Sequence, residues 1–404
     1  MSRLLVFSTL FPHPGQPQAG LFIRERMSRV ARDLPLVVVA PVPWFPGQAL
    51  LRYWRPHFRP SAPRLEYQGD IEVHHPRFLS IPGIGKRFDG ILLALSSIWC
   101  LRRLKARHGF SLIDAHFAYP DGYAAMLLGR WLRVPVTITL RGTEPRHLAT
   151  PGLASRARQA LLRARHVFAV SESLRSVAES AGVPHARTQV VGNGVDLEIF
   201  HPESRAVARR QFGIPQDAHV LITVGALVER KGFHRVIDCL PALLKRHPQL
   251  HYLVVGGASA EGNLREQLEH QARARGVADR VHFLGPLAPA QLRWPLSAAD
   301  VFVLPTRNEG WANVILEAMA CGLPVITTDV GGNREVVAHE TLGTVIPFGD
   351  APALEQAMDA ALDRKWDREA ILDYARAHQW DRKIAALVAT FRALLPPDGA
   401  EPAP

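Results

Sequence analysis

Glu309 and Glu317 belong to the segment whose residue types and spacing most clearly indicate a binding or catalytic site. The apolar run 301–304 predicts a strand, and a loop and helical spacing over 312–321 follow it, ending at Gly322. Such a helix points its free N–H groups and the positive end of its dipole at the loop, where they can bind a phosphate. One carboxylate can then accept hydrogen bonds from sugar hydroxyls and the other from the vicinal hydroxyls of a ribose. The pattern predicts a nucleotide diphosphate site, although two glutamates eight residues apart are common on surface helices.

A second segment with chemical potential follows the strand-like run 220–224. Gly225 lets backbone come close to a ligand, and Arg230 and Lys231 are adjacent cations. Arginine binds phosphate with a planar fork and lysine as a point charge, so together they can stabilise the charge on a departing nucleotide diphosphate. In that role they would replace a metal ion, and we expect neither a metal nor a cofactor beyond the donor substrate. An exposed Arg-Lys pair is also common in loops, so the assignment of a binding role to this segment depends on the neighbouring motifs.

The elements that position these residues read as two α/β series with parallel strands. At 404 residues the chain is too long for one ordinary core and long enough for two. We expect an N-terminal domain over 1–200, a C-terminal domain over 201–380, a helix over 381–395 and a disordered tail over 396–404, with a linker within 193–215. The expected strands are 4–8, 36–40, 112–115, 136–140, 166–170 and 189–192 in the first series, and 220–224, 251–255, 281–284, 301–304 and 325–327 in the second.

With its context, Glu309-Gly-Trp-Ala-Asn-Val-Ile-Leu-Glu317-Ala-Met-Ala-Cys-Gly-Leu-Pro, the sequence resembles glycosyltransferase family 4, a large retaining family. The resemblance covers nearly the whole chain. It implies the α/β GT-B fold, in which two Rossmann-like domains face each other across a cleft and the last helix crosses back to the N-terminal domain. The N-terminal domain would bind the acceptor and the C-terminal domain the nucleotide sugar.

The resemblance assigns donor-binding roles in the second half. Glu309 would contact hydroxyls of the donor sugar, Glu317 the ribose, and Arg230 with Lys231 the diphosphate. Ala312 stands where many members have glycine. The stretch 281–285 is similar to one whose backbone contacts the base, and 331–335 to a later glycine turn. The other residues expected at the donor are Gly225, Phe283, Gly310, Trp311, Asn313 and Val314.

The first half contributes further matches. Gly20 lies between the first strand and its helix, where backbone could approach the donor. His116 matches the second histidine of an H-x-H segment whose first position is Asp114 here, and would touch the donor sugar; a strand-end histidine bonded to backbone is the alternative. Arg141 and Thr143 should line the acceptor side. Asp121 could bind an acceptor hydroxyl, though Pro-Asp-Gly is ordinary turn chemistry, the interpretation we favour.

Charge is distributed unevenly. Residues 1–196 hold 26 Lys and Arg against 12 Asp and Glu, and the remainder 22 against 25. Such asymmetry suggests that the first half meets something anionic, although an arginine-rich composition alone can produce it. The stretch 41–88, dense in Pro, Trp, Phe and Arg, predicts a long loop or helical insertion. It suits either an anionic membrane interface or packing on its own domain.

Other features bound the class of protein. The three cysteines lack metal-ligand spacing, and residues 1–10 predict a strand rather than a signal peptide, which favours the cytoplasm, with the inner membrane face as an option. The longest apolar stretch, 90–101, is far short of the ~20 residues of a membrane span. No G-x-G-x-x-G follows the first strand of either half, which disfavours a dehydrogenase.

The favoured hypothesis is a metal-independent, retaining transferase that moves a sugar from a nucleotide diphosphate sugar to a saccharide or polyprenyl-linked glycan, in exopolysaccharide or surface glycan synthesis. A nucleotide-sugar epimerase or phosphorylase on the same fold is the alternative enzyme. A non-enzymatic binder of nucleic acid or anionic lipid is the third hypothesis. No recognisable nucleic-acid-binding module is present, so we expect no nucleic-acid partner.

Overall fold

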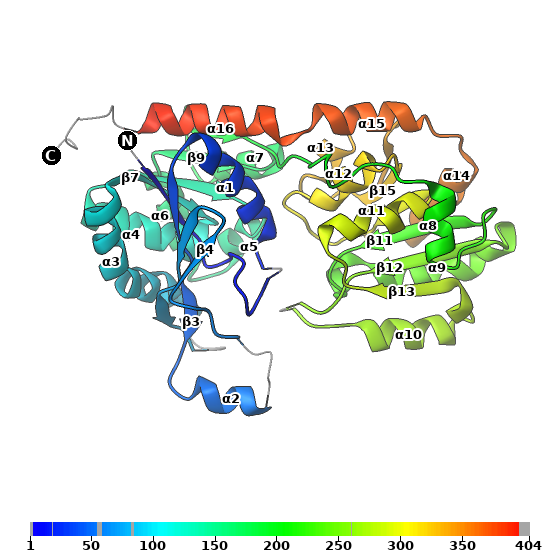
Figure 1. The fold of residues 1–404 in the computed structure, drawn as a ribbon, viewed down its shortest axis with the longest axis horizontal. Helices are drawn as coiled ribbons and strands as arrows, with labels where there is room; N and C mark the ends of the chain where they lie inside the picture. The colour runs from blue at the N-terminus through cyan, green and yellow to red at the C-terminus, as the bar shows by residue number, and fades with distance from the viewer. Residues whose placement is uncertain (1–2, 18, 55–58, 82–84, 260, 396–404) are drawn as a thin grey trace. The chain divides into compact units, whose positions relative to one another are not determined.

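A computed structural model describes residues 3–17, 19–54, 59–81, 85–259 and 261–395. The chain forms two compact units (Figure 1). Unit 1 comprises residues 1–193 and 381–404, and unit 2 comprises Gly194–Trp380. Each unit has its own sheet, so the expectation of two α/β series holds.

Unit 1 contains an eight-stranded sheet in the order β10-β9-β8-β7-β1-β2-β5-β4. All neighbouring strands pair in parallel except β4 and β5. The central strands are almost entirely buried and mainly apolar because helices cover both faces of a parallel sheet. The strands are β1 (Arg3–Phe7), β2 (Leu36–Val39), β4 (Leu65–Gln68), β5 (Ile71–His74), β7 (Phe110–His116), β8 (Val136–Leu140), β9 (His166–Ala169) and β10 (Thr188–Val190).

The stretch 41–88 differs from the sequence prediction. Besides α2 (Gln48–Trp54) it holds β4 and β5, which extend the main sheet, and a separate parallel pair, β3 (Val42–Trp44) with β6 (Arg77–Leu79). The prediction of a loop or helical insertion is therefore wrong for these segments. All four strands are three or four residues long, and β3, β4 and β6 are partly exposed whereas β5 is mostly buried, so the sequence shows no clear period. Residues 55–58 and 82–84 of the stretch, and the tail 396–404, lie outside the described residues.

The helices of unit 1 connect successive strands, and the last helix of the chain joins them. In that helix, α16 (Trp380–Leu394), the Phe391 ring packs 5.2 Å from that of Phe168, and the Arg392 guanidinium donates to the Asp33 carbonyl at 2.7 Å. The C-terminal helix thus packs on the first unit. The other helices are α1 (Leu21–Asp33), α3 (Asp89–His108), α4 (Tyr123–Leu132), α5 (Glu144–Ala149), α6 (Ala154–Arg163) and α7 (Glu172–Ser180).

Unit 2 contains a six-stranded, all-parallel sheet in the order β13-β12-β11-β14-β15-β16. This is a doubly wound arrangement, in which the chain moves to one side from β11 and to the other side from β14. The edge strand β16 begins at a glycine, and sequence reading missed it. The strands are β11 (His219–Val224), β12 (Leu250–Val255), β13 (Val281–Gly285), β14 (Val301–Leu304), β15 (Val325–Thr328) and β16 (Gly343–Ile346).

Apolar cores fill both faces of this second sheet. Alternate residues of β11, Val220, Ile222 and Val224, face one side of the sheet. The helices on that side are α8 (Arg205–Gln211), α11 (Pro289–Ala298), α12 (Asn313–Ala320) and α15 (Arg368–Ala377). Leu221 points to the other face, where α9 (Phe233–Arg246), α10 (Arg265–Ala274) and α14 (Ala351–Asp363) pack. A short helix, α13 (Asn333–Val336), follows β15. Helix α8 lies inside the segment expected as a linker.

Among the described residues, none of the helices has both the length and the apolar character required to cross a bilayer.

Candidate active site

The site in unit 2 lies at the point where the strand order reverses. Strands β11 and β14 are hydrogen-bonded neighbours, but the chain leaves them in opposite directions. Doubly wound sheets bind ligands outside the carboxyl ends of such strands. The loop 225–232 follows β11 and the loop 305–312 follows β14, so both predicted segments emerge at this edge.

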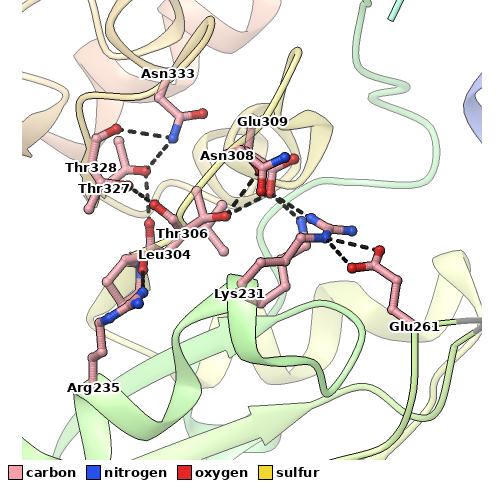
Figure 2. A network of polar contacts seen from close by, with 12 residues as sticks. Lys231, Arg235, Glu261, Leu304, Thr306, Asn308, Glu309, Thr327, Thr328 and Asn333 are labelled. Atoms are coloured by element: carbon pink, nitrogen blue, oxygen red, sulfur yellow. Dashed lines mark hydrogen bonds and ion pairs between the residues drawn. The ribbon is translucent and has the colours of Figure 1, made fainter. Parts of the chain in front are cut away.

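The two loops bring Lys231, Arg230 and Glu309 together. Figure 2 shows Lys231 beside Glu309. Lys231 Nζ lies 2.5 Å and Arg230 Nη1 3.5 Å from the same carboxylate oxygen, Oε1 of Glu309. Thr306 Oγ1 donates to this oxygen at 3.1 Å. The side chains of Lys231 and Glu309 are 13% and 11% exposed, so the pair is largely shielded from water yet reachable.

Arg230 also pairs with Glu261, an acidic residue that sequence reasoning missed. Its Nε lies 2.9 Å from Oε2 of Glu261. Burial works to lower the pKa of Arg230, but the bond to Glu261 and the charge of Glu309 outweigh it and raise that pKa. Both cations of the site are thus paired with carboxylates.

A layer of hydroxyl and amide groups fixes the loop that carries Glu309 (Figure 2). Thr328 Oγ1 donates to the Thr306 carbonyl at 2.5 Å, and Asn333 Nδ2 donates to Thr327 Oγ1 at 2.9 Å. The Arg235 guanidinium donates to the Pro305 carbonyl at 2.7 Å. Sequence reasoning did not single out these residues, because each supports the site through backbone groups that only the fold brings near.

A glycine turn after β15 touches the same loop. Gly331 has φ +54°, and a Cβ atom there would lie 1.7 Å from the Glu309 carbonyl oxygen. A glycine is therefore required for the 329–332 turn to pack against the Glu309 loop.

Gly331→Ala is expected to lower the free energy of unfolding by about 2–4 kcal/mol, because both the left-handed backbone and the close contact oppose a side chain. Urea denaturation of the purified variant measures this. Gly349→Ala has similar backbone strain, with φ +86° and open space around the Cβ position, and should cost about 1 kcal/mol. Equal losses at the two positions would contradict a close contact at Glu309.

Helix α12 has the ends that the sequence predicts. It begins at Asn313 and has no side-chain cap at Ala312, which leaves its first N–H groups available to a ligand. At the other end Gly322 has φ +78°, and Leu323 N donates to the Ala318 carbonyl at 3.1 Å, as in a Schellman motif. Glu317 lies in the second turn and is partly exposed.

The other predicted donor residues lie around these loops. Trp311 and Val314 are partly buried against the core that contains α12, and Gly310 and Ala312 are buried. Phe283, in the middle of β13, packs on the opposite core with the Arg265 guanidinium 5.7 Å from its ring centre. At Gly225 a Cβ would sit 3.5 Å from the Lys231 side chain, so that glycine borders the lysine. Their contacts with a donor remain predictions.

A buried polar cluster forms in unit 1 at the carboxyl ends of β7 and β8. Arg141 Nη2 lies 3.1 Å from His116 Nδ1, and its Nη1 donates to Asn193 Oδ1 at 3.1 Å. Arg26, which sequence reasoning missed, donates to the same Asn193 oxygen at 2.9 Å. Its only sequence signal is a charged residue on the apolar face of α1.

His116 is held neutral in this cluster. Burial, followed by the charges of Arg141 and Arg26, lowers the pKa of His116 well below its ordinary value. Because Nδ1 accepts from Arg141, the proton sits on Nε2, which lies 3.4 Å from Oδ2 of Asp114 and has no hydrogen-bond partner among the described residues. Burial also raises the pKa of Asp114 to about 6. The imidazole can thus donate a hydrogen bond from Nε2, although the side chain is fully buried in this arrangement.

Glu144 orders the loops around the cluster and was not anticipated. Its buried carboxylate accepts from the backbone N–H groups of Ala118 at 3.3 Å, Arg141 at 3.2 Å and Gly142 at 2.8 Å. Thr143 is partly buried, and its Oγ1 has no hydrogen-bond partner in the described structure. Gly20 has φ +71°, and a Cβ there would lie 2.3 Å from the Leu10 carbonyl oxygen, so its close approach is to its own loop.

Asp121 is fully buried, and Thr9 binds it. Its carboxylate accepts from Thr9 N at 3.0 Å and Thr9 Oγ1 at 2.9 Å. Burial raises its pKa to about 7, with the Thr9 bonds working the other way. Its role toward an acceptor remains a prediction, and any such role would act through Thr9 in this arrangement.

The raised pKa of Asp121 makes stability pH dependent. The folded protein holds this proton more tightly than the unfolded chain, so the contribution is present at low pH and is lost as pH rises through about 7. Between pH 5 and pH 8 the unfolding free energy of the wild type should fall, relative to Asp121→Asn, by on the order of 2 kcal/mol. Denaturation curves of both proteins at the two pH values test this. A constant difference between them would contradict a raised pKa at this carboxyl.

Solved structures with the same fold define the class. Sucrose-phosphate synthase from Thermosynechococcus elongatus superposes with a TM-score of 0.77 at 22% identity, covering 98% of this chain and 99% of that one. Anabaena HepE, solved in complex with UDP-glucose, superposes with a TM-score of 0.71 at 22% identity, covering 98% of this chain and 100% of that one. The fold is GT-B, with two parallel-sheet, Rossmann-like units, as the sequence predicts.

Family models identify the lineage within this class. Residues 56–199 match Glycosyltransferase Family 4, and residues 204–378 match Glycosyl transferases group 1. A D-inositol 3-phosphate glycosyltransferase from Corynebacterium urealyticum is 31% identical over 323 residues, which is 72% of this chain and 74% of the relative. The chain belongs to glycosyltransferase family 4, and the predicted family is confirmed.

Two further relatives differ in the share of their length that aligns with this chain. TuaC of Bacillus subtilis, whose name assigns it to teichuronic acid biosynthesis, is 28% identical over 368 residues, or 88% of each chain. A D-inositol 3-phosphate glycosyltransferase from Geodermatophilus obscurus is 35% identical over 238 residues, which is 57% of this chain. The alignment spans about half of that relative's length, 52%.

Proposed function

We propose that this protein is a retaining glycosyltransferase that moves a sugar from a nucleotide diphosphate sugar onto a saccharide or lipid-linked saccharide. The observation that carries the proposal is the contact of Lys231 and Arg230 with Glu309 at the carboxyl ends of β11 and β14. The relatives' names support a transferase, and the uncapped start of α12 supplies a further phosphate contact.

In the proposed donor complex the two cations exchange partners. A diphosphate carries more negative charge than a carboxylate, so Lys231 and Arg230 turn to it and release Glu309. The freed carboxylate then accepts hydrogen bonds from hydroxyls of the donor sugar, and Glu317 accepts from the ribose. HepE binds UDP-glucose, which makes uridine diphosphate sugars the first donors to test.

In the proposed reaction, the nucleotide diphosphate leaves as the acceptor oxygen bonds to the anomeric carbon. The acceptor proton passes to the departing diphosphate, and the new bond keeps the configuration of the old one. Each well-placed hydrogen-bond donor to the leaving group contributes roughly 3 kcal/mol. Two fixed cations provide the charge for which other enzymes use a metal ion, so we propose that the reaction needs no metal.

The acceptor side of the proposal rests on unit 1. A hollow of about 440 Å³ near the carboxyl end of β1 is lined by Thr9, which binds Asp121, and by Trp44, Arg59 and Arg77. An aromatic ring with polar groups around it suits a saccharide. Two arginines against one carboxylate, Asp89, which lines the hollow and interacts with Arg59, favour an anionic saccharide. The D-inositol 3-phosphate and teichuronic acid names of relatives agree with this class. We place the reaction in exopolysaccharide or surface glycan synthesis, at the cytoplasmic face of the membrane.

Nucleotide release measured with and without acceptor tests the proposal. A transferase releases nucleoside diphosphate at an acceptor-dependent rate and links the sugar to the acceptor with the donor's anomeric configuration, visible by NMR. Release that needs only water, or a free epimerised sugar without an acceptor, would refute it and favour an epimerase. A phosphorylase would instead require inorganic phosphate.

A further inference from the structure

Arg26, on α1, is a buried cation whose guanidinium holds the last residues of unit 1. The residue is 1% exposed. Its Nη2 donates to the carbonyls of Val191 at 2.5 Å and Gly192 at 3.0 Å, and to Asn193 Oδ1 at 2.9 Å. Asn193 directly precedes Gly194, the first residue of unit 2. Arg26 therefore fixes the backbone segment that carries Asn193.

Asn193 connects this anchor to His116. Its Oδ1 accepts from Arg26 and also from Arg141 Nη1, and Arg141 Nη2 lies 3.1 Å from His116 Nδ1. All four residues are buried. A continuous chain of hydrogen bonds thus runs from α1 to the carboxyl end of β7, where His116 is the last residue of the strand.

The two guanidinium groups of this chain have no carboxylate bound to them in the described structure. Asp114 acts on both through its charge, but its carboxylate accepts from the hydroxyls of Thr137 and Thr139. Nε and Nη1 of Arg26 have no hydrogen-bond partner among the described residues. A buried cation without an ionic partner costs stability, and such costs are typical of functional sites.

The charges of both arginines act on the imidazole of His116. Burial comes first, and the charges of Arg141, on the loop between β8 and α5, and of Arg26, on α1, follow in lowering its pKa. The other titratable groups of this network are Asp114 on the same strand, Glu144 on α5, which acts on Arg141, and Lys383 on α16, which lies near Arg26.

These other groups do not cancel the positive charge. Burial raises the pKa of Asp114 to about 6, and backbone N–H groups bind the Glu144 carboxylate. Burial, followed by the charge of Arg26, lowers the pKa of Lys383 to about 8. The imidazole therefore stays neutral and, because its Nδ1 accepts from Arg141, carries its proton on Nε2.

We propose that Arg26 is a positioning residue for sugar transfer. Through Asn193 it holds Arg141 against Nδ1 of His116, so that the imidazole offers the proton on Nε2 to the donor sugar. Arg26 itself does not touch the substrate. The inference rests on the proposed function for the role of His116 in transfer, whereas the effect of Arg26 on the imidazole is measurable without any transfer.

The imidazole signals of His116 test this effect directly. The full-length protein is labelled with ¹⁵N-histidine, and the His116 signals are assigned by their loss in His116→Gln. We expect the wild type to show a neutral ring with its proton on Nε2 from about pH 5 to pH 8. Arg26→Met removes the charge and the hydrogen bonds. Its His116 should take up a second proton at a higher pH than in the wild type, or hold its single proton on either nitrogen.

Steady-state kinetics measure the consequence for transfer. Arg26→Met should lower kcat by about ten- to hundredfold and leave the KM of the donor within about threefold, because orientation is lost rather than donor binding. Arg26→Lys keeps a positive charge and a donor, so kcat should return to within about fivefold of the wild type and the His116 ring should stay neutral. Arg32→Met removes an exposed arginine of the same helix and should match the wild type in both measurements.

The outcomes separate positioning from a structural role. If Arg26→Met does not fold, Arg26→Gln, which keeps a hydrogen-bond donor without the charge, replaces it. Unchanged His116 signals in the folded variant would overturn the proposal, because Arg26 would then only hold the end of unit 1. Changed signals beside a wild-type rate would also overturn it. A wild type without transfer activity would instead refute the proposed function, and this role with it, before any variant is compared.

Discussion

Arg230→Ala is expected to lower kcat by about 10²- to 10³-fold, because in the proposed reaction it removes a charged hydrogen-bond donor from the departing diphosphate. The free energy of unfolding should change by less than about 1 kcal/mol, since the Arg230 side chain pairs with Glu261, which is 53% exposed, and Lys231 still neutralises Glu309. Steady-state kinetics with the preferred donor, paired with urea denaturation, measure both quantities.

Arg307→Ala is the matched control for Arg230→Ala. Arg307 sits on the loop that carries Glu309, is 57% exposed, and approaches only Glu229, at 3.9 Å. Its removal should leave kcat within about threefold, as expected for a weak surface pair. If both variants lost activity equally, the effect would reflect the total positive charge of the loops rather than a contact with the leaving group.

Glu309→Gln should separate donor binding from transfer. The carboxylate holds Lys231 and competes with an incoming diphosphate, so the amide variant is expected to bind nucleoside diphosphate about three- to tenfold more tightly. Transfer should nevertheless fall by about 10²-fold or more, because the group proposed to accept hydrogen bonds from the sugar hydroxyls has lost its charge. Calorimetry and initial rates provide the two measurements.

Glu261→Gln provides the contrast for Glu309→Gln. Glu261 also holds a cation of the site, Arg230, but lies on a different loop and is 53% exposed. Its amide variant should bind nucleoside diphosphate as tightly as Glu309→Gln while keeping transfer near the wild-type rate. A comparable loss of transfer in both variants would rule out a specific role for Glu309 at the sugar.

The parts of the fold that sequence predicts are those whose hydrophobic pattern is strong. Strand β14 is a continuous apolar run, β8 alternates apolar residues with threonine, and the predicted limits of both strands match the structure. The strands β3 to β6 were missed because they are short and contain proline or charged residues, and three of the four are partly exposed. Their pairing depends on neighbours distant in the chain, which no local pattern reveals.

For the candidate site, sequence motifs locate the reactive side chains but not the residues that hold them in place. The order of strand, loop and helix suffices to bring Glu309 and Lys231 to one sheet edge. Glu261, Arg26 and Glu144 act through charges or backbone groups of residues remote in sequence, and each alone looks like an ordinary charged residue. The neutral state of His116 likewise follows from burial and two arginines that only the fold assembles.

The central claim is that Arg230 and Lys231 hold a diphosphate without a metal ion. Titration calorimetry of nucleoside diphosphates against the wild type and Arg230→Ala/Lys231→Ala, in the presence of a chelator, tests it most directly. We expect one nucleoside diphosphate to bind the wild type in the chelator and to bind the double variant at least about a hundredfold more weakly. Equal affinity of the two proteins, or binding that appears only when magnesium is restored, would contradict the claim.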